Sequence, residues 1–425
     1  MKLLNTNVSI IYIFIIINIA AFCILGLIPA KALISNSIFI FLLNLSFLSL
    51  VIVFALLTYF IIPKKRMKVN RNLMNSNIIR KNFLLLSILP IIGIILVSYD
   101  RIITRGINYS EGLRYARYAW LDTSGGNVLG ILGNLLIPFS YVGIFFIILY
   151  STSVSKKLQV FLIISIFFGV IGHAALNGGR SNLLLAIIMI IISMIFKKKQ
   201  RNKTLYKDYL TKTKIFLLGI IATTYIWYIT SLSASMGGTG IGELLQEGIV
   251  ALYGIPNQAF FSNEHSSLIY FLIYFLSYLF HGQWTAEISY SLIDRGGNYS
   301  IPPIIGILAN KFNLGKITEG QTYFGDTGAF ISLPGGFYYD YGFFGLILLS
   351  IFLGNLLGVA FVLINKSKRI GGLQTVFIMS ILYILFMSPI IAAYGLSYFS
   401  FIMYAFLMLS IINILVFKHK INLLP

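Results

Sequence analysis

Long runs of apolar residues constrain this chain more than any other feature. Ten of them are expected to cross a bilayer, at 8–28, 36–62, 82–98, 127–150, 158–176, 182–196, 214–233, 337–364, 372–390 and 398–417. A helix of about 20 residues spans the hydrocarbon core, where an open backbone would leave its polar groups without partners. Hydrophobic residues make up 58% of the 425 positions and charged residues only 10%. The sequence therefore predicts an all-α polytopic membrane protein.

The number of spans depends on the shorter apolar run at 266–280. If it crosses the bilayer, a segment near 285–309 must cross back; otherwise it lies in the interface or re-enters. We therefore expect 10–12 transmembrane helices. The run at 8–28 is longer than the apolar core of a cleaved signal peptide, so it is expected to be retained. Without a repeat or a low-complexity linker, the chain (1–425) is predicted to be a single integral membrane domain.

Basic residues gather between the apolar runs on one predicted side of the membrane. The segments 64–81, 156–157, 197–214, 366–369 and 418–420, together with Lys2, hold 23 of the 32 lysines and arginines but one of the twelve acids. An excess of basic residues marks cytoplasmic loops, so both termini are predicted to be cytoplasmic. Topology and attraction to anionic lipid account for the net charge of +20, so nucleic acid is not expected as a partner.

Two segments are predicted to lie on the outer side, a first one at 99–126 and a large one at 234–336. The inner loops are short and contain no GxxxxGK[ST] motif, and GGTGIG (237–242) has the wrong spacing for a dinucleotide site. These observations exclude a nucleotide-consuming cytoplasmic domain. The single cysteine, Cys23, excludes an intramolecular disulfide and a thiolate metal site. Any chemistry is therefore expected on the outer side.

The outer basic residues differ in kind from the inner ones. Six of the nine outer basic residues are arginine, against five of the 23 inner ones. Lysine suffices to set topology, whereas the planar guanidinium binds phosphate or carboxylate with two hydrogen bonds. Arg180, in NGGRSN (177–182), precedes a predicted helix, and an anion there would also meet the positive end of the helix dipole. Arg114 and Arg117 share one helical face, which an interfacial helix would equally explain.

These features resemble the Wzy-type oligosaccharide repeat-unit polymerases, which are related to the O-antigen ligases. GGRSNLLLAI (178–187) is similar to the small-residue and arginine turn of that family, and PGGFYYDYGFFGLILL (334–349) to its aromatic and acidic segment. The predicted layout of many spans with one large outer loop is also similar. Arg101, Arg114 and Arg295 are each followed by glycine eleven positions later, as in the Arg-x10-Gly motifs of some members. The resemblance implies a GT-C-like arrangement.

The resemblance also implies a metal-independent glycosyltransferase that needs no cofactor. It would polymerise oligosaccharide repeat units carried on undecaprenyl pyrophosphate into O-antigen or capsular polysaccharide. The candidate pyrophosphate-binding residues are Arg180, Arg114, Arg117 and Arg295. The candidate general bases are His281 and Asp326, and the candidate sugar-binding residues are Trp284, Tyr323 and Tyr339. Asp294 next to Arg295 would also fit a simple ion pair, and a lone histidine near a span end, such as His173, is more typical of packing than of proton transfer.

The implied location is the bacterial cytoplasmic (inner) membrane, with the active side periplasmic. The implied partners are the lipid-linked oligosaccharides and the bilayer, with a chain-length regulator and a flippase as further candidates. Two other functions stay open. One is an O-antigen ligase, and the other is a lipid-linked oligosaccharide flippase. Transporters commonly carry carboxylates within broken helices at the bilayer centre, a pattern that this sequence does not show.

Overall fold

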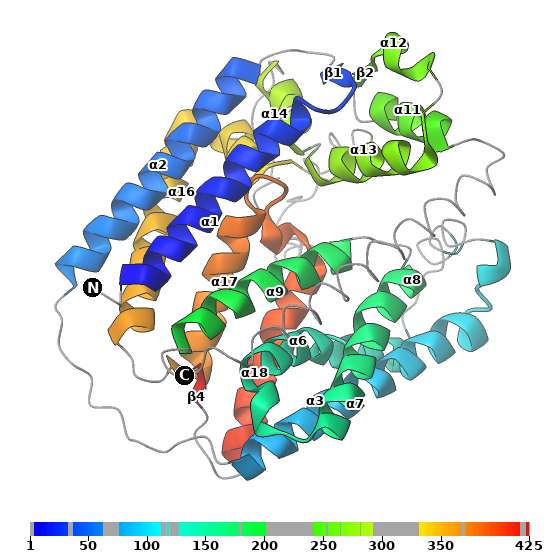
Figure 1. Ribbon diagram of the computed structural model, residues 1–425, viewed down its shortest axis with the longest axis vertical. Helices are drawn as coiled ribbons and strands as arrows, with labels where there is room; N and C mark the ends of the chain where they lie inside the picture. Colours follow the sequence, from blue (N-terminus) through cyan, green and yellow to red (C-terminus); the bar gives the residue numbers. More distant parts are fainter. Residues whose placement is uncertain are drawn as a thin grey trace, which may run out of the picture. The chain divides into compact units, whose positions relative to one another are not determined.

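The computed structural model describes residues 4–32, 37–62, 76–111, 116, 119, 127–177, 181–200, 241–251, 254–263, 265–280, 282–291, 331–366, 370–416 and 422–424 (Figure 1). These residues are predominantly helical, so the predicted all-α class is confirmed. The exceptions in the described part are two short antiparallel strand pairs. β1 (Ala30–Ala32) pairs with β2 (Gly254–Pro256), and β3 (Ile370–Gly371) pairs with β4 (Asn422–Leu424).

Seven of the described helical segments are long and apolar enough to cross a membrane. They are Asn7–Leu25, Ile38–Ile61, Asn77–Thr104, Val128–Ser153, Lys156–Asn177, Leu333–Asn365 and Tyr398–Leu415. Each coincides with an expected span. The expected spans 182–196 and 372–390 form shorter apolar helices, Asn182–Lys197 and Gly372–Met387. The expected span 214–233 lies outside the described residues, so the total of 10–12 stays a prediction.

The described chain divides into two compact units, each assembled from distant parts of the sequence. Unit 1 comprises Met1–Lys65, Gly237–Asn365 and Ile381–Ser397, and unit 2 comprises Arg66–Met236, Lys366–Ser380 and Tyr398–Pro425. The helix α17 (Gly372–Met387) contributes to both units. Neither unit corresponds to one continuous stretch, as is usual for helices that pack across a bundle.

Unit 1 is built on α1 (Leu4–Leu25), α2 (Ser37–Ile61) and α16 (Leu333–Lys366). The helices α1 and α2 lie side by side through edge-on rings such as Phe22 and Phe41, whose centroids are 5.5 Å apart (Figure 1). A Cβ atom at Gly354 of α16 would lie 2.7 Å from the Cβ atom of Phe54 in α2. Small residues thus allow these two apolar helices to approach closely. The positive φ of 64° at Gly342 marks a kink inside α16.

Apart from its share of α17, the other described α-helices of unit 1 belong to the segment predicted to lie outside, 234–336. They are α11 (Ile241–Ala251), α12 (Gln258–Phe261), α13 (Ser267–Phe280) and α14 (Gly282–Ser291). The 14 residues of α13 rise about 21 Å, which is less than the hydrocarbon core of a bilayer. The short apolar run is therefore a helix, as expected, and is too short to span unaided. After α17, the chain turns through the short η6 (Ala393–Gly395).

Unit 2 holds the helices α3 (Ser76–Ser98), α5 (Val128–Leu136), α6 (Phe139–Tyr150), α7 (Lys156–Phe167), α8 (His173–Asn177), α9 (Ser181–Gln200) and α18 (Ser397–Leu415). Short π- and 3-10 segments join or extend them, namely η1 (Tyr99–Thr104), η2 (Tyr109–Glu111), η3 (Ser151–Ser153) and η4 (Phe168–Gly172). Phe145 of α6 lies at the centre of the core, 5.5 Å from the ring of Phe406 and 6.5 Å from that of Phe196. Aromatic packing therefore joins α6, α9 and α18.

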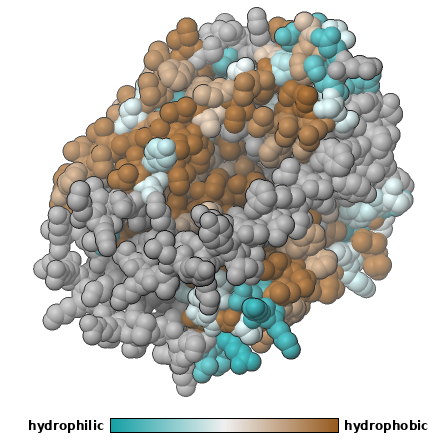
Figure 2. Space-filling view, in the orientation of Figure 1, coloured by the Kyte–Doolittle hydropathy of each residue, from teal (hydrophilic) through white to brown (hydrophobic). Residues whose placement is uncertain are grey.

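Many large apolar side chains of the described helices are exposed. Figure 2 shows them gathered over α1 and α2, where Ile38, Phe60 and Ile61 are each more than 70% exposed. An apolar patch of this size is not typical of a soluble monomer, whereas lipid tails would solvate it without cost. The exposed faces therefore support a membrane-embedded protein.

Candidate functional site: a buried polar network in unit 2

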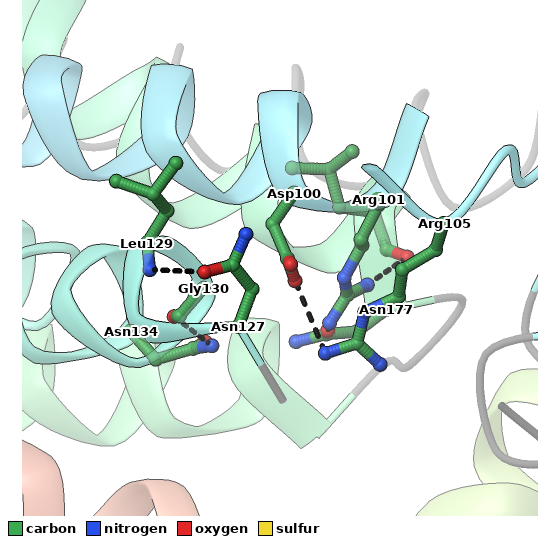
Figure 3. Close-up of polar contacts among 9 residues, drawn as sticks. Asp100, Arg101, Arg105, Asn127, Leu129, Gly130, Asn134 and Asn177 are labelled. Atoms are coloured by element: carbon green, nitrogen blue, oxygen red, sulfur yellow. Dashed lines mark hydrogen bonds and ion pairs between the residues drawn. The ribbon is translucent and has the colours of Figure 1, made fainter. Parts of the chain in front are cut away.

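A buried ion pair lies at the end of α3, where the chain widens into the π-helix η1. Arg105 binds the carboxylate of Asp100 through a contact of 3.1 Å between Nη2 and Oδ2 (Figure 3). The backbone amide of Arg105 donates to the carbonyl oxygen of Asp100, five residues earlier, over 3.0 Å. Asp100 and Arg101 are each only 2% exposed. Segments of π-helix are frequent at functional sites, and ionisable groups buried in an apolar span are commonly functional.

A glycine of α5 makes room for this carboxylate. A Cβ atom at Gly130 would lie 2.9 Å from Cγ of Asp100 and closer still to Oδ2, so a larger residue does not fit. The same glycine accepts a hydrogen bond of 2.8 Å from the Asn134 side chain one turn later (Figure 3). Gly130 therefore contacts Asp100 and also binds Asn134, so α5 connects the ion pair with the Asn134 side chain.

Arg101 caps the C-terminal end of the helical segment Lys156–Asn177. Its guanidinium donates to the carbonyl oxygen of Leu176 and to Oδ1 of Asn177. The Tyr109 hydroxyl donates to the same Leu176 oxygen over 2.9 Å. The last carbonyl groups of a helix have no partners within it and form the negative end of its dipole, so a cation is favoured there. Arg101 therefore ties the end of α8, at Leu176 and Asn177, to η1.

His173 lies one turn before Asn177 and connects three helices through neutral amides. Its Nε2 lies 3.2 Å from Oδ1 of Asn134 in α5 and 2.6 Å from Nδ2 of Asn177. Its Nδ1 lies 2.8 Å from Nδ2 of Asn182 in α9. The imidazole is 1% exposed. It therefore joins Asn177 of α8 to Asn182 of α9, as the packing role expected for a lone histidine implies.

Two tyrosines complete the network from α6 and α18. The Tyr141 hydroxyl donates to the backbone oxygen of Asn182 over 3.0 Å. The Tyr398 ring packs on the imidazole of His173, with centroids 4.4 Å apart, and its buried hydroxyl has no hydrogen-bond partner among the described residues. The end of α8 is thus held by Arg101 and Tyr109, and Asn182 near the start of α9 is held by His173 and Tyr141.

Most of the residues predicted from sequence for the site lie outside the part of the chain that the structure describes. This applies to the pyrophosphate-binding candidates Arg180, Arg114, Arg117 and Arg295, to the candidate bases His281 and Asp326, and to Tyr323. Their convergence in one site stays a prediction.

The other two candidates, Trp284 and Tyr339, are both 4% exposed and lie in unit 1. Trp284 packs in an apolar cluster with Ile28, Leu245 and Ile249. Tyr339 packs in another, which includes Ile40 and Ala286. Both residues make the contacts of core residues. Their expected role in stacking on sugars stays a prediction.

Unit 1 contains polar groups of its own beside these aromatic residues. Gln283 of α14 accepts a hydrogen bond of 3.1 Å from Asn44 and donates one of 2.6 Å to the Pro389 carbonyl oxygen. Two acids, Glu287 and Asp340, are also buried there. Among the described residues, no three His, Cys, Asp or Glu side chains form a group that could hold a metal ion.

The network of unit 2 was not assembled by sequence reasoning, although some of its members were noticed. The sequence predicts that Arg101 lies in the outer segment 99–126, whereas η1 continues the helix through the first part of that segment. Arg101 and its partner Leu176 are 75 positions apart, so no local pattern connects them. One pattern in the sequence could have indicated the network: three asparagines and one histidine lie in or beside the ends of predicted apolar spans. They are Asn134, His173, Asn177 and Asn182.

Comparison of the chain with protein-family models, with curated proteins and with solved structures finds no match.

Proposed function

We propose that this protein is a glycosyltransferase that polymerises lipid-linked oligosaccharide repeat units on the outer face of the bacterial cytoplasmic membrane. Its donor would be a glycan on undecaprenyl pyrophosphate, and its acceptor a sugar hydroxyl of the next lipid-linked unit. The reaction, the substrates and the location in this proposal come from the resemblance of the sequence to Wzy-type polymerases. The apolar, largely helical chain is consistent with an enzyme whose substrates both reside in the bilayer.

The observation that carries the proposal is the anchoring of the two end residues of the NGGRSN motif (177–182). Asn177 and Asn182, the first and last residues of this motif, are both held by the buried network around Arg101 and His173. Arg180 lies between them in the sequence and directly precedes the first residue of α9. Negative charge grows on the diphosphate as it leaves. A positive charge held in place beforehand stabilises it most, because no free energy is then spent on reorganising the site during the reaction.

The proposed reaction exchanges one glycosidic bond for another. The acceptor oxygen attacks the anomeric carbon of the donor, and the bond from that carbon to the pyrophosphate oxygen breaks with its electron pair left on the pyrophosphate. The acceptor proton passes to a general base, for which His281 and Asp326 are the candidates from sequence. Arginines then stabilise the negative charge that grows on the departing pyrophosphate.

The test is turnover of purified protein in vitro with lipid-linked repeat units, comparing the wild type with Arg180→Lys and Arg180→Ala. We expect both variants to lose activity, because lysine keeps the charge but lacks the planar pair of donors. Full activity in Arg180→Lys would contradict bidentate binding of the pyrophosphate.

Extracts of cells that lack the protein separate the polymerase from the alternatives. Loss of a polymerase leaves surface chains one repeat unit long. Loss of a ligase leaves polymer on the lipid carrier, and loss of a flippase leaves single units on the inner side. Either of the last two outcomes would refute the proposed polymerisation.

A further inference from the structure

We propose that α3 and α7 form a binding site for the headgroup of an anionic phospholipid, with Arg80 and Lys157 as the residues that bind its phosphate. This inference does not depend on the proposed polymerase activity. It rests on the register in which the two helices pack, on the directions of four exposed cations, and on the apolar side chains beside them. The predicted topology puts this site in the inner leaflet.

The helix α3 packs against α7 and its continuation η4, and the two run parallel along one seam (Figure 1). The Ser165 hydroxyl donates to the carbonyl oxygen of Leu86 over 3.4 Å. One turn further along both helices, a Cβ atom at Gly169 would lie 3.1 Å from the Cβ atom of Pro90. Both pairs are 79 positions apart, so the two helices keep one register along the seam.

This register brings two exposed cations to the same end of the seam. With an offset of 79 positions, Arg80 lies level with Gln159, two residues beyond Lys157. At 1.5 Å per residue, Arg80 and Lys157 are about 3 Å apart along the helix axes, on helices that typically pack about 8–10 Å apart. Both long side chains can therefore reach a single phosphate group.

The helical repeat also decides on which side of the seam each cation lies, since the side-chain direction turns by about 100° per residue. Measured from the residues in contact across the seam, Arg80 points about 100° to one side on α3, and Lys157 points about 100° in the opposite sense on α7. Because the two helices run parallel and face each other, both cations flank the same side of the seam. Lys81 and Lys156 are equally classed as exposed but point away from it, at about 160°.

The same side of the seam is apolar next to the two cations. Leu84 lies one turn after Arg80 on α3, and Ile164 lies two turns after Lys157 on α7. Leu84, Ile164 and Phe168 are each about half exposed. An acyl chain can therefore lie along these side chains while the phosphate of the same molecule meets the cations.

The charges favour a headgroup with a net negative charge. The segments 76–99 and 151–177 contain no acidic residue, so they offer no carboxylate to the ammonium group of a zwitterionic lipid. Arg80 has the planar pair of donors that binds phosphate, and Lys157 adds a point charge. Lys157 also lies in the first turn of α7, where the positive end of the helix dipole favours an anion.

Lipid titration of the purified full-length protein in a neutral detergent, followed by native mass spectrometry, tests the inference. We expect phosphatidylglycerol to bind roughly twentyfold more tightly than phosphatidylcholine, because each basic residue near a membrane surface contributes about fivefold in affinity for anionic lipid. Arg80→Gln and Lys157→Gln are each expected to weaken the binding of phosphatidylglycerol about fivefold. The matched variants Lys81→Gln and Lys156→Gln remove the same charge from neighbouring positions that point away from the seam, and are expected to change the affinity by less than about twofold.

Equal weakening by all four variants would indicate general attraction to a basic surface and would overturn the site. Equal affinity for the two lipids would overturn it as well. Inorganic phosphate, added at constant ionic strength, is expected not to displace the lipid, because it lacks the acyl contacts; displacement would show that the site takes a small anion instead.

A measurement on the wild type keeps the inference testable if a variant does not fold. A phosphatidylglycerol with a photoactivatable group next to its headgroup should label 80–84 and 157–164 more strongly than α2, whose apolar side chains are also exposed. Equal labelling of α2 would count against a site at the α3–α7 seam.

Discussion

Gly130→Ala probes whether the buried carboxylate of Asp100 has the fixed position that the network requires. The added Cβ atom would lie 2.9 Å from Cγ of Asp100 and closer to Oδ2, well inside van der Waals contact. Overpacking of this kind costs about 1–3 kcal/mol. If Asp100 moves away, it also loses part of its contact with Arg105, and a hydrogen bond between charged groups contributes about 1.5–3 kcal/mol.

An opposing effect must be subtracted from this cost. Alanine favours a helix over glycine by about 1 kcal/mol, and Gly130 lies inside α5. The expected net loss is therefore about 2–4 kcal/mol in the free energy of unfolding. It is measured on the purified full-length protein by titrating mixed micelles with a denaturing detergent and following helical circular dichroism.

Two controls make the result specific. A Cβ atom at Gly172 would meet nothing closer than 3.5 Å, at Cδ1 of Ile94, so Gly172→Ala is expected to be neutral or slightly stabilising. In an Asp100→Ala background, Gly130→Ala should no longer cost stability, because the carboxylate that it displaces is absent. The reasoning is refuted if Gly130→Ala is as stable as the wild type, or if its cost persists without Asp100.

Two further predictions use the same unfolding measurement. Tyr141→Phe should destabilise by about 0.5–1.5 kcal/mol, since its hydroxyl donates to α9, whereas Tyr398→Phe should not, since its buried hydroxyl has no partner in the part of the chain that the structure describes. A greater loss in Tyr398→Phe than in Tyr141→Phe would contradict this assignment. Gly358→Ala should destabilise by about 1–3 kcal/mol, because its Cβ atom would lie 2.5 Å from that of Thr58, while Gly395→Ala, with open space around it, should not. Similar stability of the two glycine variants would show that α2 and α16 do not depend on this close approach.

The sequence by itself determined the class of the protein and the position of most helices. Apolar runs can be read locally, since each must satisfy its own backbone hydrogen bonds when it enters a bilayer. The break between the runs 158–176 and 182–196 was likewise visible as NGGRSN, and the helices α8 and α9 end and begin at this motif.

Only the tertiary structure decided which polar residues work together. The sequence predicts Arg101 in an outer segment, but a π-helical extension of α3 brings it to Leu176, which lies 75 positions further along the chain at the end of another span. Likewise, nothing local shows that Gly130 makes room for Asp100. Such relations depend on how helices cross, and the crossing is set by the packing of many side chains at once. For this reason the hydrophobic pattern predicts the spans, whereas the network that joins them required the fold.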